Sequence, residues 1–92
     1  MLQNDTPFRM VIKAYHVVPD MVLIVEGKVL SGWLRPAATV RVYGAGKPEF
    51  SVQTRDVAHQ RDTNQTHIRV FLPGVLPTHV TAGMMVTTDG VE

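Results

Sequence analysis

Apolar side chains recur at every second position along most of this 92-residue chain. In residues 39–43 and 67–72 they alternate with other residues, as along a β-strand that buries one face. Only residues 75–82 suit a helical turn, and no longer stretch shows the 3.6-residue spacing of an amphipathic helix. The alternation therefore predicts an all-β fold. In the first strand, the expected buried face carries Phe8, Met10, Ile12 and Ala14.

The strand pattern also indicates where the turns and the core lie. Gly27 stands inside the longest strand, where a glycine marks a bulge or a close backbone approach. Residues 60–65 contain no apolar side chain and are expected to form an exposed loop. The expected strands are residues 8–15, 21–30, 39–43, 50–57, 67–72 and 84–88, with a short return at 33–34. The expected core contains Ile12, Val25, Val42, Val52 and Val70.

The length of the chain limits how these strands can pack. Ninety-two residues suit one domain, and without cysteine no disulfide compensates for a small core. Closing a sheet on itself buries apolar surface and removes exposed strand edges. We therefore expect a closed or nearly closed antiparallel barrel of six to seven strands in residues 7–92. Residues 1–6 are expected to be a disordered or linker-like N-terminus.

The N-terminus and the hydropathy bear on the cellular location. Residues 1–10 lack the basic start and the continuous apolar run of a signal peptide. No stretch of the chain reaches the roughly 18 apolar residues that a membrane helix needs. A cytoplasmic protein with no membrane partner is therefore expected.

The motifs that suggest an enzyme are incomplete. Gly44–Lys47 is similar to the end of a phosphate-binding P-loop. Arg41, however, stands where the first glycine of that loop belongs, and Pro48 replaces its serine or threonine. Asp56 and His59 suit part of a catalytic triad, yet no serine lies in a Gly-x-Ser-x-Gly setting. We expect no enzymatic activity and no bound nucleotide.

The four histidines do not follow a metal-binding pattern. No two of them have the close spacing that is typical of a zinc site, and the chain has no cysteine that completes one. We therefore expect no metal site and no cofactor.

The net charge of +1 is unevenly distributed. Residues 28–69 hold seven Lys and Arg residues against three Asp and Glu residues. Such a basic region attracts phosphate groups, although charges that alternate with apolar residues are also typical of the solvent sides of strands. Trp33, Tyr43 and Phe71 interleave with arginines, the mixture by which small barrels bind single-stranded nucleic acid. The alternative is that Trp33 covers one barrel end and Phe71 packs in an outer layer.

The order of these turns and strands resembles the second, β-barrel domain of translational GTPases of the elongation factor Tu type. The resemblance covers residues 7–90 and depends on the order and spacing of short motifs. These motifs are Pro7–Ile12, Val18–Val29, Ser31–Arg35, Val40–Gly44, Val70–Val75 and Thr81–Val86. The resemblance implies the barrel of that domain without its GTPase domain, as a stand-alone relative or an excised domain.

The resemblance also implies positions for a partner site. In tRNA-bound members of the family, this domain contacts the aminoacyl end of the tRNA. Met21 stands where those members carry arginine, and Asp56 stands near their glutamate. His59 and His67 lie near a second arginine and an asparagine. Ala37 replaces a family glycine after the short return, which implies a turn conformation that alanine tolerates.

The function expected from these features is a non-enzymatic binding module that contacts RNA, the ribosome or a translation factor. The candidate residues for that contact are Arg41, Arg55, Asp56, His59, His67 and Arg69. The alternative is a protein-interaction barrel with no nucleic-acid role, which forms a homodimer or docks on another protein. The candidate exposed interface for that alternative is Val11, Tyr15, Trp33 and Phe71.

Overall fold

The computed structural model describes residues 6–62 and 65–90. Its strands are β1 (Arg9–Val18), β2 (Val22–Ser31), β3 (Thr39–Gly44), β4 (Lys47–Gln53), β5 (Asp56–Asp62), β6 (Gln65–Pro73) and β7 (Met85–Thr87). One 3-10 turn, η1 (Pro77–His79), lies within the helical turn expected at residues 75–82. The all-β prediction is confirmed. Except for Thr6, the expected N-terminal linker lies outside the described residues.

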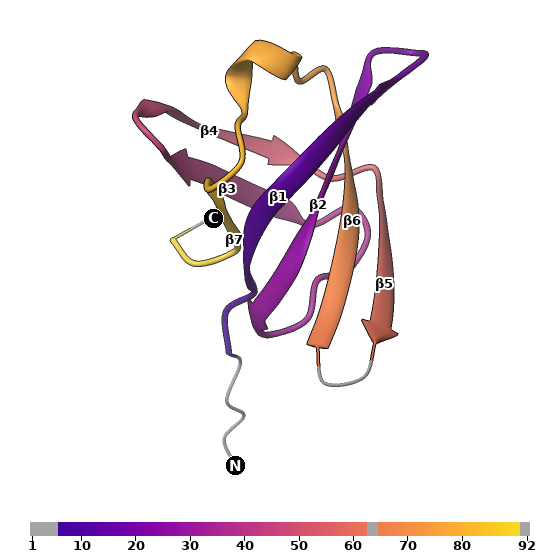
Figure 1. Cartoon of the computed structure of the whole chain (residues 1–92), viewed down its shortest axis with the longest axis vertical. Coiled ribbons are helices and arrows are strands. Elements are labelled where there is room, and N and C mark those ends of the chain that lie inside the picture. The colour runs from indigo at the N-terminus through magenta and orange to yellow at the C-terminus, as the bar shows by residue number, and fades with distance from the viewer. Residues whose placement is uncertain (1–5, 63–64, 91–92) are drawn as a thin grey trace.

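The strands form one seven-stranded sheet in the order β4-β3-β7-β1-β2-β6-β5. Every neighbouring pair is antiparallel. Figure 1 shows β1, β2 and β6 side by side along the molecule, while β3 and β4 run across them. Because side chains from all these directions meet in one apolar cluster, the sheet curls around a single core.

The sheet is not closed, because β4 and β5 are its two edges. In a closed barrel, a ladder of hydrogen bonds joins the first strand of the sheet to the last. Here the short connection between β4 and β5 joins the two edges instead. The Thr54 amide donates to the Ala38 carbonyl at 2.8 Å, on the β3 side. The next amide, of Arg55, donates to the Phe71 carbonyl of β6 at 2.8 Å. The single strand expected at residues 50–57 is therefore wrong, since this corner divides it into β4 and β5.

The inward side chains of the sheet form the expected apolar core. Ile12, Val25, Val42 and Val70 are buried, as the alternation predicts. Val52 is half-buried and packs against the core from the edge strand β4. The other large buried side chains are Phe8, Met10, Leu23, Leu34, Ile68, Leu72 and Met84.

A β-bulge interrupts the pairing of β1 with β2. Ile12 is the partner of Gly27. The next paired residue of β1 is Ala14, opposite Glu26, so Lys13 is the extra residue of the bulge. The extra residue shifts the alternation by one position, which turns Ala14 to the outer face of the sheet. The expectation that Ala14 shares the buried face is therefore wrong.

Gly27 lies where β2 passes very close to the backbone of β1. A Cβ atom on this residue would lie 1.8 Å from the carbonyl oxygen of Val11, far inside van der Waals contact. Only glycine fits here without a shift of one strand. The close approach predicted for this glycine is confirmed.

The edge strand β5 is longer than the alternation predicts. It continues to Asp62, and β6 begins at Gln65, so most of the loop expected at residues 60–65 is strand. Residues 63–64 are not among those described. Cross-strand pairing, such as that of Gln60 with His67, holds this polar segment in place. An edge strand has much of its surface in water, so its side chains need not alternate between apolar and polar.

The turn before β3 uses a conformation that favours glycine. Ala37 has φ of 67°, in the left-handed region, so the expectation of a conformation natural to alanine is wrong. Pro36 precedes it, and the Ala38 amide donates to the Arg35 carbonyl at 3.3 Å. The Ala37 carbonyl also accepts a hydrogen bond from Gln53 Nε2 at 2.9 Å. Proline second and a positive φ third are the pattern of a type II turn.

Candidate binding surfaces

The six candidate RNA-contacting residues do not gather on one surface. Arg41 lies on β3, Arg55 precedes β5, Asp56 and His59 lie on β5, and His67 and Arg69 lie on β6. Only the last three, His59, His67 and Arg69, border a common hollow.

Arg41 belongs to a separate network on the β3–β4 side. Its Nη1 donates to Glu49 Oε2 at 3.2 Å, and its Nε donates to the Asp89 carbonyl at 3.2 Å. The guanidinium also lies over the Tyr43 ring, 5.0 Å from the ring centroid. These contacts hold Arg41 against its own sheet, and Glu49 offsets part of its charge.

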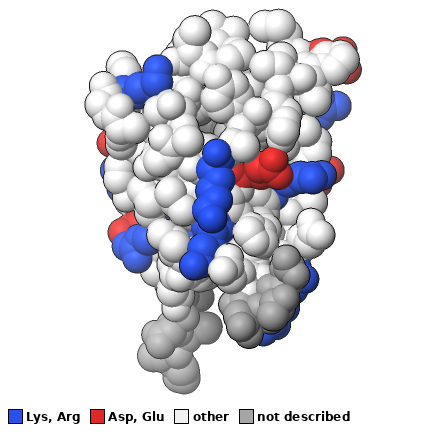
Figure 2. Space-filling model, viewed as in Figure 1, with Lys and Arg blue, Asp and Glu red and all other residues white. Residues whose placement is uncertain are grey.

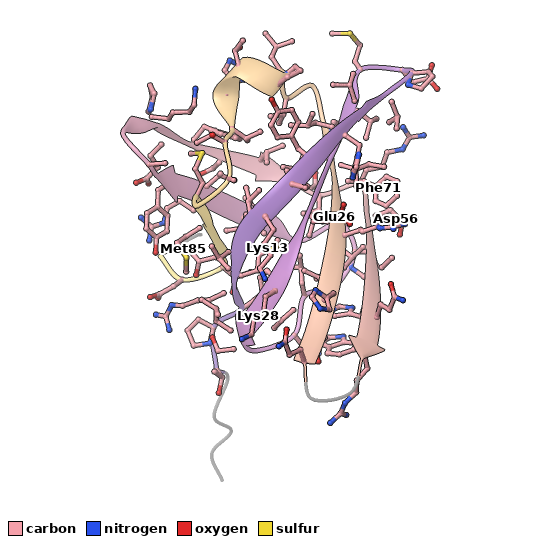
Figure 3. The ribbon with its side chains drawn as sticks, in the orientation of Figure 1. Lys13, Glu26, Lys28, Asp56, Phe71 and Met85 are labelled. Atoms are coloured by element: carbon pink, nitrogen blue, oxygen red, sulfur yellow. The ribbon has the colours of Figure 1, made fainter. Side chains whose placement is uncertain are left out.

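Arg55 and Asp56 lie at the corner between β4 and β5, and both are exposed. Asp56 Oδ1 accepts a hydrogen bond from the Val57 amide at 2.9 Å, so this carboxylate caps the start of β5. Figure 3 shows Asp56 beside Phe71, well away from Lys28 at the other end of the sheet. Asp56 pairs with Phe71, whereas His67 pairs with Gln60 further along β5, so Asp56 and His67 are separated along the β5–β6 ladder.

The rings of Trp33 and His59 stack face to face beside β5. Their centroids are 3.6 Å apart, and their planes differ by 4°. Burial lowers the pKa of His59, which favours the neutral imidazole in this stack. Trp33 remains 66% exposed, so the ring face turned away from His59 is open to solvent.

Exposed cations lie close to this aromatic stack. Arg35 and Trp33 line the same hollow. Arg61 follows His59 by two residues on β5, and alternate residues of a strand point to the same side. Both arginines are exposed. The stack is therefore a flat aromatic surface with positive charge nearby.

A second hollow, of about 500 Å³, lies on the outer face of β1, β2, β6 and β5. We call it the outer-face hollow. Small residues, Ala14, Gly27 and Ala58, contribute to its lining. The polar and charged residues around it are Lys13, Glu26, His59, Gln60, His67 and Arg69. Figure 2 shows blue side chains beside a red one on this face, and Figure 3 labels Lys13, Lys28 and Glu26 there.

Glu26 is held between two neighbours on this face. Its Oε2 lies 2.6 Å from His16 Nε2, and its Oε1 accepts a hydrogen bond from Arg69 Nε at 3.4 Å. The hydrogen bond with His16 is the main cause that lowers the pKa of Glu26. Burial opposes this effect, and Arg69 adds to it. Lys13 and Lys28 form no ion pair with any side chain that the structure describes.

The alternation did not single out Lys13, Glu26 or Lys28 as candidates. Each is a charged residue in a strand of mainly apolar residues. This is the only feature of the sequence that marks them as candidates for a binding site. Their proximity depends on the register of β1 against β2, in which Val11 is opposite Lys28. The bulge at Lys13 changes that register, and alternation alone does not reveal it.

The four candidate interface residues lie in different parts of the molecule. Tyr15 is 40% exposed on the β1–β2 hairpin, whereas Trp33 follows the far end of β2. Val11 and Phe71 are half-buried on the outer face. These residues do not form one continuous patch, because the length of β2 separates Tyr15 from Trp33.

The tip of the β1–β2 hairpin carries exposed apolar side chains that were not among the candidates. Val17 and Met21 are both largely exposed, on either side of the turn at Pro19. Asp20 and Met21 have φ of 72° and 60°, which is unusual for residues with a side chain. The proline turn was visible in the sequence, but the exposure of its flanks was not.

No protein-family model matches the chain, and no curated protein matches it. Within residues 6–62 and 65–90, no three His, Asp or Glu side chains come together in an arrangement that suits a metal ion. No helix in the described part of the chain is long and apolar enough to cross a membrane. The geometry of the two surfaces is therefore the basis for the functional interpretation.

Proposed function

We propose that this protein is a non-enzymatic binding module that contacts single-stranded RNA in the cytoplasm. The observation that carries the proposal is the exposed ring of Trp33, stacked on His59 at 3.6 Å. The stack fixes the tryptophan ring, so a base that joins it loses less ordering entropy than with a free side chain.

The physical chemistry of the stack favours a nucleic acid base as the ligand. Any base has a flat π-face, and stacking of a base on an aromatic side chain contributes about 1–3 kcal/mol. Arg35 and Arg61 add positive charge for the backbone of the same strand. A flat ring with cations nearby suits single-stranded RNA better than a duplex, whose bases are already stacked.

The proposal includes kinship with the second domain of elongation factor Tu-type GTPases. Several features support it: the proline turn before β2, the glycine within β2, and the order of antiparallel strands around one core. The chain link at Thr54 joins the two edge strands, which supports the barrel that the kinship implies. The partner class then includes a translation component that presents RNA.

A fluorescence titration tests the RNA proposal directly, because Trp33 is the only tryptophan of the chain. A short unstructured oligouridylate should quench its emission, and affinity should fall as salt rises. The Trp33→Ala variant, measured by anisotropy of labelled RNA, should bind at least about fivefold more weakly.

Tyr15→Ala is the matched control, because Tyr15 is an exposed aromatic residue distant from the stack. The affinity of Tyr15→Ala for RNA should stay within about twofold of the wild type, because the variant leaves the stack and its neighbouring arginines unchanged. No binding of the wild type at low salt contradicts the proposal.

The second candidate function is a protein-interaction module, favoured by the exposed Val17 and Met21 at the hairpin tip. A homodimer or another docked protein would remove these side chains from water. Light scattering with size-exclusion chromatography tests the dimer: a mass above that of one chain, lost in a Val17→Ser, Met21→Ser double variant, supports it. A monomer at high concentration contradicts self-association.

A further inference from the structure

The outer-face hollow lies beside the shift in the β1–β2 register. The bulge turns Ala14 outward, where it contributes only a methyl group, and Gly27 lines the hollow next to it. Ala58 on β5 lines the same hollow. Across the sheet, the row Ala14–Glu26–Arg69–Ala58 has a small residue at each end and two longer charged side chains between them.

The rim of the hollow is positively charged. Lys13 is the bulge residue, which places an extra cation on this face. Arg69 comes from β6, and only its Nε contacts Glu26. Lys28 is opposite His67, which lines the hollow. Lys13 and Arg69 line the hollow together with Glu26, and Lys28 lies beside it on the same face.

The carboxylate of Glu26 does not block an anion from this site. One of its oxygens contacts His16 Nε2, and the other accepts from Arg69 Nε. Lys13 and Lys28 have no ion pair with any described side chain, so their charges are available to a ligand. The net charge of the three cations and Glu26 is positive, which favours an incoming anion.

We propose that the outer-face hollow is a phosphate-binding site. Resting on the proposed function, this inference assigns the hollow to a phosphate group of the bound RNA. Phosphate suits the site because several oxygens can accept hydrogen bonds from Lys13, Lys28 and the terminal nitrogens of Arg69. A volume of about 500 Å³ accommodates a phosphate with its sugar. His59 lines the hollow, but it pairs with the buried Ile68, so its side chain and the Trp33 ring lie on the other side of β5 from Ala58. The phosphate site and the base site therefore flank this edge strand.

Pyrophosphate is the first probe, because it carries the same chemistry without a base. In NMR titrations at low salt, the largest amide shifts should fall on Ala14, Gly27 and Ala58. Lys13→Gln should weaken binding about fivefold, the loss of one partly exposed charge contact. Lys47→Gln removes the same charge from β4, where Lys47 Nζ donates to the Thr78 carbonyl, and should change affinity less than twofold.

A second variant tests whether binding needs the space in the hollow as well as the charge of its cations. Ala58→Leu fills the hollow from an exposed position on an edge strand and keeps every cation. Pyrophosphate affinity should fall at least tenfold while the fold is retained. Equal affinity of Ala58→Leu and the wild type overturns the proposal, and so do shifts that map away from the hollow.

RNA titrations then distinguish this inference from the proposed function. Lys13→Gln should reduce the slope of log affinity against log salt by about one unit. RNA binding that depends on Trp33 but keeps the same slope in Lys13→Gln overturns the phosphate site alone. Pyrophosphate binding without RNA binding supports the phosphate site and contradicts the RNA function. Oligonucleotides with and without a 5′-phosphate separate a terminal phosphate from a backbone phosphate: preference for the phosphorylated end assigns the former.

Discussion

The two faces of β1, β2 and β6 consist of the same strands, yet they differ in what determines them. On the inner face, Ile12, Val25 and Val70 are buried in one apolar core. On the outer face, Lys13 and Glu26 belong to a charged surface around a hollow. Burial alone sets the inner positions, whereas the outer arrangement depends on which residues the register brings side by side.

This difference separates stability from binding. Removing a buried aliphatic side chain leaves a cavity and costs about 2–5 kcal/mol. Surface ion pairs contribute about 0–1 kcal/mol, so charged residues can change with little loss of stability. Inner-face substitutions should therefore lower stability, and outer-face substitutions should lower ligand affinity.

The largest loss of stability is expected at Gly27, because the pairing of β1 with β2 determines the residues on both faces. Gly27→Ala places a Cβ 1.8 Å from the Val11 carbonyl oxygen, so β1 and β2 must separate. The free energy of unfolding, measured with urea, should fall by more than about 3 kcal/mol. The chemical shifts of the outer-face hollow should change together with those of the core.

Gly46→Ala is the matched control for this prediction. Gly46 has φ of 75° and open space around its Cβ position, so only backbone strain is added. Its cost should be about 1–2 kcal/mol. Equal losses of stability in the two variants would mean that close contact at Gly27 does not matter.

Neighbouring residues on β1 give the sharpest contrast between the faces. Ile12→Ala should lower the free energy of unfolding by about 3 kcal/mol and leave pyrophosphate affinity unchanged in the folded fraction. Lys13→Ala should change stability by less than about 0.5 kcal/mol and weaken pyrophosphate binding. A large loss of stability in Lys13→Ala contradicts the separation of the two faces.

The pH dependence of stability tests the aromatic stack and the outer face separately. Burial lowers the pKa of His59, so the unfolded state binds the proton more tightly. Stability should fall as the pH drops below 6.5, the ordinary pKa of histidine, and His59→Gln should flatten this part of the curve of stability against pH.

The pKa of Glu26 is also lowered, mainly by His16. The stability that it contributes is therefore present above pH 4.5, its ordinary value, and is lost as the pH falls through the folded value.

Chemical denaturation of the wild type and both variants across pH 3–8 measures these changes. Glu26→Gln should flatten only the part below pH 4.5. Wild-type and variant curves that stay parallel throughout contradict the assignment of these two groups.

The smallest change in stability is expected at Ala37, in the turn before β3, which lies on neither face of β1, β2 and β6. Ala37 has φ of 67°, where glycine is favoured, so Ala37→Gly should stabilise the fold by about 0.5–1 kcal/mol. The greater freedom of glycine in the unfolded chain offsets part of the gain. Thermal unfolding should show a slightly higher midpoint, with pyrophosphate affinity unchanged. A lower midpoint would indicate that the Ala37 methyl group makes a stabilising contact.

Much of the fold was predictable from local pattern. The alternation located most strands, the buried core residues, and the close approach at Gly27. It did not locate the corner at Thr54 or the full length of β5, because polar edge residues carry no alternation. It also placed Ala14 on the wrong face, since one extra residue in a bulge shifts every later side chain.

The candidate binding surfaces were less predictable than the core. The sequence indicated Trp33, His59, His67 and Arg69 as separate candidates. It did not indicate that Trp33 stacks on His59, or that Lys13 lies beside the hollow. Both facts depend on which strands are neighbours.

By itself, the sequence determined the all-β class and the membership of the core, because burial follows from the chemistry of each side chain and its period along the chain. Only the tertiary structure decided that β4 and β5 remain sheet edges joined at Thr54. It likewise decided that Lys13 faces the same hollow as Arg69, from residues far apart in the chain. The physical reason is that strand order and register come from long-range pairing. A change of register moves all the residues of a strand to new partners at once.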